Sequence, residues 1–202
     1  MPPFDQSIPT LILWAVLGYL FGSIPFGLVI TRMLGLGDLR EIGSGNIGAT
    51  NVLRTGNKPA ALATLLLDAG KGAIAVLTAR AVIGEDAAQI AGLMALTGHC
   101  FPVWLEFRGG KGVATFLGLI LALSWPVGLA CCLTWAVVAA LGRISSLAAL
   151  AAAASVTLWV LLLTDGAMLV LGLVLTALVF SRHRENIARL REGTEPRIGS
   201  RG

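Results

Sequence analysis

Seven apolar stretches limit what this chain can fold into. They cover residues 8–31, 59–83, 87–105, 112–123, 126–142, 144–163 and 166–181. A helix needs about 20 apolar residues to cross the hydrocarbon core of a bilayer, and most of the stretches reach that length. The pattern predicts an all-α integral membrane protein, with residues 1–202 forming a single membrane domain.

The apolar region from 112 to 142 could form one helix or two. One continuous helix would be about 46 Å long, which is far longer than the hydrocarbon core is thick. Ser124, Trp125 and Pro126 favour a break, because proline fits the first turn of a helix and tryptophan favours the membrane interface. We therefore expect seven transmembrane helices, of which the fourth is unusually short.

The distribution of basic residues supports seven spans. Lys and Arg accumulate in cytoplasmic loops, and seven spans place 13 of the 15 on one side. A single span over 112–142 would move Arg143 and the arginine-rich tail to the opposite side. We expect the N-terminus outside and the C-terminus in the cytoplasm. The cytoplasmic segments would be the loops at about 35–58 and 106–111 and the tail at 182–202.

The composition excludes a disordered chain, a small secreted domain held by disulfides and a nucleic-acid-binding protein. Hydrophobic residues make up 56% of the chain and charged residues only 13%, against about 25% charged residues in a soluble domain. The net charge of +4 is explained by membrane orientation, so we expect membrane lipid and no nucleic acid as a partner.

The first long loop is rich in glycine and small polar residues. Gly43, Gly45 and Gly48 fit GxGxxG, but dinucleotide binding needs a preceding strand, and here a membrane helix precedes the motif. Glycines still let backbone N–H groups converge on an anion, and Arg54 can form two parallel hydrogen bonds to phosphate. Ser44, Asn46, Thr50 and Asn51 would add neutral polar groups. The alternative is a glycine-rich turn with a solvated arginine.

The third loop contains a second candidate anion site. Gly110-Lys111 is shared with phosphate loops, but Leu105 and Gly112 break the GxxxxGK[ST] pattern, so nucleotide hydrolysis is not expected. What remains is the pair Gly109-Gly110, a lysine and a helix that begins near Gly112, where free N–H groups favour an anion. Two such loops on one membrane face indicate phosphate-bearing ligands more strongly than either loop does.

The tail after the last span is basic. If its helix continues past the membrane, Arg182, Asn186 and Arg189 share one face, with His183 one turn before Asn186. A basic helix end could simply anchor to anionic lipid headgroups. Lipid anchoring needs neither His183 nor Asn186, so a role in the site is the more informative hypothesis.

Two ionisable residues lie inside the second apolar stretch. Asp68 and Lys71 are three residues apart, and burying their charges in a membrane is costly unless they pair. Either a structural ion pair or support for the loop above would explain them. His99, at the end of the third stretch, is either an ordinary core residue or part of the site.

Motifs for a nucleophile or a metal are missing from the sequence. It contains no GxSxG, no HExxH and no His with Asp five residues later. We find no cluster of Cys, His and carboxylates suited to a metal, and we expect no cofactor.

Together these segments resemble the PlsY family, the bacterial glycerol-3-phosphate acyltransferases that use acyl phosphate. The matching stretches are Gly22-Ser23-Ile24-Pro25, the Ser44 to Arg54 loop, Asp68 with Lys71-Gly72, His99 to Thr115, and His183 to Glu195. The resemblance implies transfer of a fatty acyl group from acyl phosphate to the 1-hydroxyl of glycerol 3-phosphate. The products are lysophosphatidic acid and phosphate, in the first step of bacterial phospholipid synthesis. It also implies the bacterial inner membrane, an active site facing the cytoplasm, and a soluble enzyme that produces acyl phosphate as a candidate partner.

The resemblance also implies roles for individual residues. The catalytic residues would be Ser44, Arg54, Lys111, His183 and Asn186. Substrate or phosphate binding would fall to Gly43, Gly45, Asn46, Thr50, Asn51, Gly109, Gly110 and Arg189. Supporting residues would be Asp68, Lys71, His99 and Glu195. Either His183 or a substrate phosphate oxygen could take the proton of the attacking hydroxyl.

Two other functions, a transporter and a small accessory membrane protein, explain fewer of these features. A transporter for small organophosphate anions would also need cationic groups, but its site should lie near the bilayer midplane, often with inverted repeats. Here the polar residues lie mainly in loops on one side. A small accessory membrane protein would leave the three polar clusters without a purpose.

Overall fold

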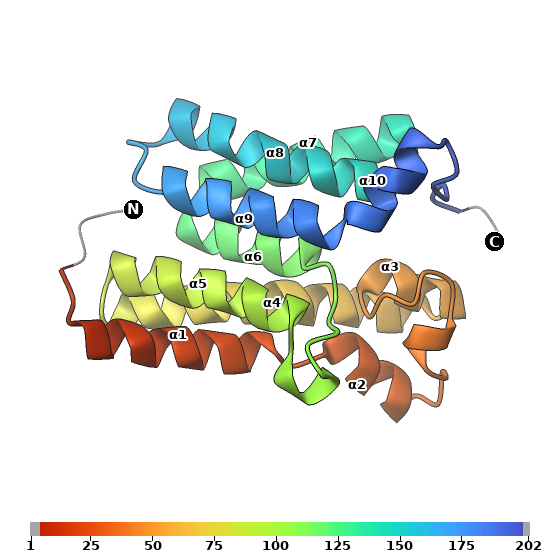
Figure 1. Cartoon of the computed structure of the whole chain (residues 1–202), viewed down its shortest axis with the longest axis horizontal. Helices are drawn as coiled ribbons and strands as arrows, with labels where there is room; N and C mark the ends of the chain where they lie inside the picture. Colours follow the sequence, from red (N-terminus) through yellow and green to blue (C-terminus); the bar gives the residue numbers. More distant parts are fainter. Residues whose placement is uncertain (1–4, 200–202) are drawn as a thin grey trace.

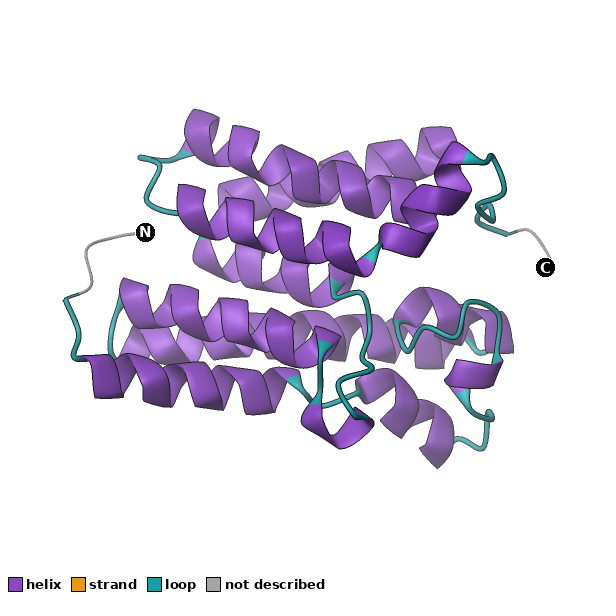
Figure 2. Cartoon of the chain, viewed as in Figure 1, coloured by secondary structure: helices purple, strands orange, loops and turns teal. Residues whose placement is uncertain are grey.

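The structure is a computed structural model that describes residues 5–199, and every regular element in that range is helical (Figure 2). The α-helices are α1 Ile8–Gly22, α2 Phe26–Met33, α3 Ala49–Val52, α4 Lys58–Val82, α5 Glu85–Cys100, α6 Val113–Leu123, α7 Trp125–Gly142, α8 Ser145–Leu163, α9 Leu169–Arg182 and α10 Arg184–Arg191. Short 3-10 helices are η1 Leu39–Glu41, η2 Leu53–Thr55 and η3 Val103–Leu105. The all-α prediction is confirmed.

The long helices form two groups that α6 joins. In Figure 1, α1, α4 and α5 lie together on one side, and α7, α8 and α9 lie on the other. Helix α6 contacts both α4 and α7, and its Phe116, Leu119 and Ile120 are buried in the core. Large apolar residues such as Leu66 and Leu162 face outward instead, as expected of side chains that contact lipid.

Within residues 5–199, five helical segments are long and apolar enough to cross a membrane. They are Ile8–Met33, Lys58–Val82, Glu85–Leu105, Trp125–Gly142 and Ser145–Leu163. Two shorter apolar helices, α6 and α9, correspond to the fourth and seventh predicted stretches. With 11 residues, α6 is about 16 Å long, so it is as short as the sequence suggested.

The expected break between the fourth and fifth stretches is confirmed. Helix α6 ends at Leu123 and α7 begins at Trp125, with Ser124 in an extended conformation between them. Pro126 lies in the first turn of α7, where its missing N–H leaves no hydrogen bond unmade.

The first stretch also breaks, which the apolar pattern over 8–31 did not predict. Pro25 has no N–H, and a proline disfavours helical geometry at the residue before it. Two carbonyls at the break accept hydrogen bonds from side chains elsewhere in the chain, and Ile24 O also accepts from Phe26 N at 3.1 Å. Trp104 Nε1 donates to Ser23 O at 2.7 Å, and Lys71 Nζ donates to Ile24 O at 2.7 Å.

The helix after the last span continues past the apolar stretch, but with a break at His183, so the condition set for the tail is met only in part. Helix α9 ends at Arg182, and His183 has φ −104° and ψ 11° before α10 begins at Arg184. The His183 ring folds back on the preceding turn, because its Nδ1 lies 2.8 Å from Val179 O, which also accepts the His183 N–H at 3.1 Å. The chain changes direction at His183 (Figure 1). Residues 200–202 of the predicted tail lie outside the described residues.

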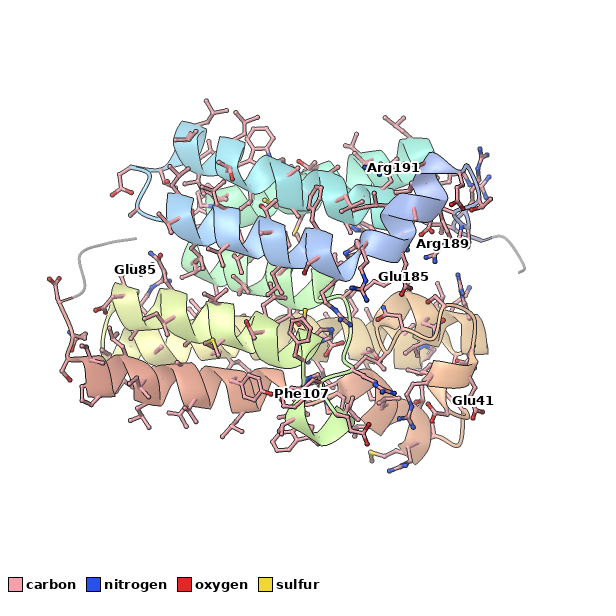
Figure 3. All side chains as sticks on the ribbon, in the orientation of Figure 1. Glu41, Glu85, Phe107, Glu185, Arg189 and Arg191 are labelled. Carbon is pink, nitrogen blue, oxygen red and sulfur yellow. The ribbon has the colours of Figure 1, made fainter. Side chains whose placement is uncertain are left out.

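The long polar loops lie at one end of the bundle, and the short turns lie at the other end. We call the end that holds residues 35–58, 101–112, 143–146 and 182–199 the loop end. The tail reaches the turn before α8 there, since Ile198 N donates to Arg143 O at 2.6 Å. The opposite, far end holds the turns near 84, 124 and 165, where Gln6 N donates to Asp86 Oδ2 at 3.2 Å. Figure 3 shows Glu85 at the far end and Arg189 at the loop end.

Candidate functional site

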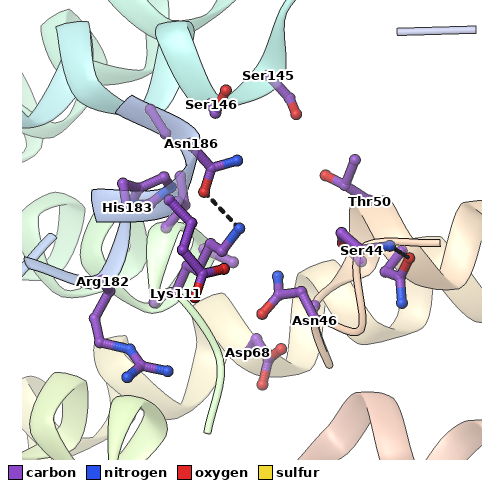
Figure 4. A pocket seen from close by; sticks show the side chains of 18 of the residues that line it. Ser44, Asn46, Thr50, Asp68, Lys111, Ser145, Ser146, Arg182, His183 and Asn186 are labelled. Atoms are coloured by element: carbon purple, nitrogen blue, oxygen red, sulfur yellow. Dashed lines mark hydrogen bonds between the residues drawn. The ribbon is translucent and has the colours of Figure 1, made fainter. Parts of the chain in front are cut away.

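A cavity of about 730 Å³ opens at the loop end, and all three predicted polar segments line it (Figure 4). The predicted residues in its wall are Gly43, Ser44, Gly45, Asn46, Thr50, Asn51, Arg54, Asp68, His99, Gly109, Lys111, His183, Asn186, Arg189 and Glu195. Gly110 and Lys71 lie behind the wall. The structure thus brings together residues that are up to 152 positions apart in the sequence.

The first loop is built around Asn51. Its buried side-chain amide donates to Leu39 O at 2.9 Å and Ile42 O at 3.0 Å, and its Oδ1 accepts from Ser44 N at 3.3 Å. Both of its donors are therefore used inside the loop, so Asn51 holds the loop together. Asn51 also lines the cavity, and its role in binding substrate stays a prediction.

Gly43 lets Arg54 approach the loop closely. Gly43 has φ 54°, and a side chain there would overlap the Arg54 guanidinium. Arg54 follows α3 in η2 and is exposed in the cavity wall. A planar guanidinium in this position can present two parallel N–H groups to an oxyanion.

The glycine pair of the third loop is fixed from two sides. Gly110 N donates to His99 O at 3.0 Å, and Gly109 N donates to Cys100 O at 3.1 Å. Arg182 donates to both glycine carbonyls, from Nη2 to Gly109 O at 3.0 Å and from Nε to Gly110 O at 3.2 Å. Arg182 therefore anchors this loop to the end of α9.

Lys111 lies at the start of α6, where backbone N–H groups of the first turn point toward the cavity end. Its Nζ donates to Asn186 Oδ1 at 2.6 Å, the contact drawn as a dashed line in Figure 4. Burial, assisted by the nearby Arg189 guanidinium, holds the pKa of Lys111 below its ordinary value. An ammonium has three donors, so Asn186 leaves capacity for an anion.

Glu195 ties the tail to the rest of the site. Its carboxylate accepts hydrogen bonds from Ser146 Oγ at 2.6 Å, Asn186 Nδ2 at 2.5 Å and Arg189 Nε at 2.6 Å. Burial alone would raise the pKa of Glu195, but these hydrogen bonds outweigh it, and the pKa lies below its ordinary value. The carboxylate is thus held ionised and in place.

His183 is buried, with 2% of its surface exposed, and its ring is oriented by the backbone. Because Val179 O can only accept, Nδ1 carries the proton that it donates at 2.8 Å, and Nε2 is left as the acceptor. Burial and the Lys111 and Arg182 charges lower the pKa of His183 to about 4, despite the hydrogen bond to Val179. The imidazole is therefore neutral near pH 7.

The expected pair inside the second stretch is present. Lys71 Nζ lies 2.8 Å from Asp68 Oδ1, and both side chains are almost fully buried. His99 Nδ1 lies 3.6 Å from the same carboxylate oxygen. The His99 ring is buried and also lines the cavity, and its part in the site stays a prediction.

Several residues of the cavity were not predicted. Ser145 and Ser146 begin α8 at the turn that follows Arg143, and a signal existed, because charge placed that turn on the side of the other loops. An apolar part of the wall comes from α4, α6, α7 and α8. Its residues are Leu65, Leu117, Cys132, Trp135 and Ala149. Nothing in their sequence context distinguishes them from residues that face lipid.

The side chains do not suggest a metal centre. Among residues 5–199, no group of three or more His, Cys, Asp or Glu residues could hold a metal ion. Independence from metal stays a prediction.

Comparisons with known proteins identify the family. The family model described as glycerol-3-phosphate acyltransferase matches residues 12–193. A glycerol-3-phosphate acyltransferase of Cereibacter sphaeroides is 70% identical over 201 residues, covering 100% of this chain and 96% of the relative. One of Ruegeria pomeroyi is 68% identical over 201 residues, covering 100% and 99%.

Solved structures agree with these relatives. The crystal structure of PlsY (YgiH), described as an integral membrane glycerol 3-phosphate acyltransferase in its glycerol 3-phosphate form, is 40% identical with a TM-score of 0.87. The match covers 94% of this chain and 96% of that one. Its lysophosphatidic acid form matches with a TM-score of 0.86 and the same identity, covering 94% of this chain and 95% of that one. The chain therefore belongs to the PlsY family of membrane glycerol-3-phosphate acyltransferases.

Proposed function

We propose that the chain transfers a fatty acyl group from acyl phosphate to the 1-hydroxyl of glycerol 3-phosphate, giving lysophosphatidic acid and inorganic phosphate. The observation that carries the proposal is a single cavity with a cationic, amide-rich wall and an apolar wall. Such a cavity suits two phosphate-bearing substrates, one of which has a long apolar chain. The forms named for the solved PlsY structures support glycerol 3-phosphate as acceptor and lysophosphatidic acid as product.

The reaction needs little covalent help from the protein. The hydroxyl oxygen bonds to the acyl carbonyl carbon, and the bond from that carbon to the phosphate oxygen breaks. Phosphate leaves with the electron pair, so no protein nucleophile is required. Catalysis then rests on positioning the two substrates and stabilising the developing negative charge.

Cationic side chains bind phosphate and stabilise negative charge, and neutral polar groups orient them or add hydrogen bonds. Arg54 holds one phosphate through its guanidinium, and Lys111 stabilises negative charge beside the N-terminus of α6. Ser44 contributes a hydroxyl at the cavity wall, and Asn186 orients the Lys111 ammonium. The remaining binding residues of the polar wall are Gly43, Gly45, Asn46, Thr50 and Gly109, while Arg189 and Glu195 brace Asn186.

The proton of the attacking hydroxyl goes to a substrate phosphate oxygen. A general base works best with a pKa near the working pH, and His183, with its pKa of about 4, is a weak base. The second pKa of a phosphate monoester is about 6, which makes the phosphate the better acceptor. Nε2 of His183 then accepts a hydrogen bond that positions glycerol 3-phosphate.

The membrane topology follows from the same account. Five long helical segments and the two shorter apolar helices make seven crossings, with the loop end in the cytoplasm of a bacterial inner membrane. Single cysteines replacing Asp38, Arg108 or Arg197, in a background without native cysteines, should react only with reagents applied from the cytoplasm. Reaction of Arg197→Cys from outside would contradict this topology.

The donor is tested with purified protein and labelled glycerol 3-phosphate. Acyl phosphate alone should support turnover when it is compared with acyl-CoA and acyl-loaded carrier protein, and a chelator should not change the rate. Comparable turnover with acyl-CoA, or loss with the chelator and recovery with a divalent cation, would contradict the proposal. A soluble enzyme that produces acyl phosphate remains a candidate partner at the loop end.

A further inference from the structure

Lys71 does more than neutralise Asp68. Its side chain, 1% exposed, lies on α4 behind the cavity wall and makes no contribution to the lining. Besides its 2.8 Å pair with Asp68, its Nζ donates to Ile24 O at 2.7 Å and lies 5.6 Å from the centre of the Phe26 ring. The ammonium thus contacts both sides of the break between α1 and α2.

The break places a carbonyl beside the ammonium. Pro25 interrupts the helical hydrogen bonds, and Ile24 O accepts from Phe26 N at 3.1 Å in a tight turn as well as from Lys71 Nζ. An ammonium has three donors and can serve a carbonyl and a carboxylate at once, which a neutral apolar side chain cannot. On the outer side, Trp104 Nε1 completes the arrangement by donating to Ser23 O at 2.7 Å.

The position of the break sets the position of the first loop. Helix α2 starts at Phe26, and its Gly27 lies directly against Ile47 O, so that a side chain at Gly27 would overlap that carbonyl. Ile47 is in the loop that carries Ser44 and Asn46. A shift of the α1–α2 break would therefore move the loop that rests on α2.

The other partner of Lys71 leads to the third loop. Asp68 lines the cavity and lies 3.6 Å from His99 Nδ1. The His99 ring packs against Gly110, and His99 O accepts the Gly110 N–H at 3.0 Å. Lys111 follows directly, so both loops of the site are connected to the same ammonium group.

We infer that Lys71 is a positioning residue for acyl transfer. By holding the α1–α2 break and orienting Asp68, it fixes the positions of the two anion-binding loops relative to each other. The inference rests on the proposed roles of those two loops. It does not depend on the identity of the acyl donor, because both loops are needed for glycerol 3-phosphate to meet any donor.

The test separates clamping from simple charge neutralisation. Lys71→Met leaves Asp68 as an unpaired buried charge and should destabilise the protein. The double variant Asp68→Asn/Lys71→Met carries neither charge and should recover thermal stability. Because it still lacks the ammonium that ties Ile24 O to α4, its KM for glycerol 3-phosphate should remain about tenfold or more above the wild-type value. Wild-type KM in the stable double variant would overturn the inference.

A matched control lies on the same helix. Arg80 also pairs with a carboxylate, Glu85, and also donates to carbonyls at a helix break, those of Ala122 and Leu123 at the far end. Arg80→Met should lower thermal stability and leave the KM for glycerol 3-phosphate unchanged. An equal rise in KM in Arg80→Met would show that any weakened bundle impairs binding, and would overturn the specific role of Lys71.

A second variant keeps the test decisive if the double variant does not fold. Trp104→Phe removes only the outer hydrogen bond to the break, and Trp104 is exposed, so folding should be preserved. Its KM for glycerol 3-phosphate should rise about three- to tenfold, and a wild-type KM would overturn the clamp. Wild-type protein is assayed beside it with acyl phosphate, acyl-CoA and acyl carrier protein, so that a failure of the proposed donor is seen separately.

Discussion

The cationic side chains at the two ends of the bundle differ in how many of their donors are already used by protein groups. At the far end, Arg80 donates to Glu85 at 2.7 and 3.0 Å, to Ala122 O at 2.6 Å and to Leu123 O at 3.0 Å. At the loop end, Lys111 donates to a neutral amide, and Arg54 is exposed in the cavity wall. Arg80 is thus satisfied by groups that hold the helices together, whereas Lys111 and Arg54 keep donors for an anion.

The two helix breaks repeat this contrast. The α6–α7 break at Ser124 lies at the far end and is closed by Arg80. The α1–α2 break lies deeper in the molecule, is closed by the buried Lys71, and continues into the first loop of the site. The α6–α7 break stabilises the fold, and the α1–α2 break, which is connected to the loops, also determines the geometry of the site.

The largest effect should come from removing a cavity cation. Lys111→Ala and Arg54→Ala each lose a charge-assisted contact to phosphate, which costs about 1.5 to 3 kcal/mol, or roughly ten- to a hundredfold in kcat/KM. Arg54→Lys should recover only part of the loss, because an ammonium cannot form the two parallel hydrogen bonds of a guanidinium. Near-normal kinetics in both folded alanine variants would mean that the loop-end cations do not bind phosphate and do not differ in function from Arg80 at the far end.

A smaller effect is expected at His183. If it positions glycerol 3-phosphate through a neutral hydrogen bond, His183→Ala should raise KM about three- to tenfold and change kcat less. A thousandfold lower kcat with unchanged KM would instead identify His183 as the base.

The pH profile sharpens this prediction. The pKa of about 4 keeps the His183 ring neutral as the pH falls from 7.5 to about 5.5, so its contribution should stay constant over that range. An acid-side fall near pH 6 would then belong to the substrate phosphate and should persist in His183→Ala. Its disappearance in that variant would assign the titration to His183.

The smallest kinetic effect should follow from loss of the far-end cation. Arg80→Gln removes the pair with Glu85, which is partly exposed and so contributes only about 0.5 to 1 kcal/mol, together with the contacts to the end of α6. We expect a lower melting temperature and a kcat/KM within about twofold of wild type. A tenfold fall in kcat/KM would mean that the far end also contributes to the site.

Sequence reasoning worked where composition or charge changes abruptly along the chain. Trp125 and Pro126 predicted the break before α7, and the glycine, lysine and arginine of the loops predicted which segments line the cavity. The sequence does not distinguish an asparagine that contacts a ligand, such as Asn46 is expected to be, from one that also holds its own loop, such as Asn51. Only the fold shows that its amide is used by Leu39 O and Ile42 O.

The remaining features depend on contacts that no local pattern carries. The break at His183 lies in a segment without proline or glycine, and the contact of its ring with Val179 O is visible only in the fold. Cys132 and Trp135 line the cavity, yet they lie in an apolar helix whose other faces contact lipid or the core. Hydrophobicity marks all of these faces alike, so the direction of each side chain had to come from the packing.

Direct binding of glycerol 3-phosphate tests the central claim, that the loop end holds the anion site. Isothermal calorimetry would compare wild-type protein with Lys111→Ala and Arg80→Gln, each purified in the same detergent and shown to be folded. We expect Arg80→Gln to bind glycerol 3-phosphate as tightly as wild type, whereas the Kd of Lys111→Ala for glycerol 3-phosphate should rise at least about tenfold. Unchanged binding in Lys111→Ala, or loss of binding in Arg80→Gln, would contradict it.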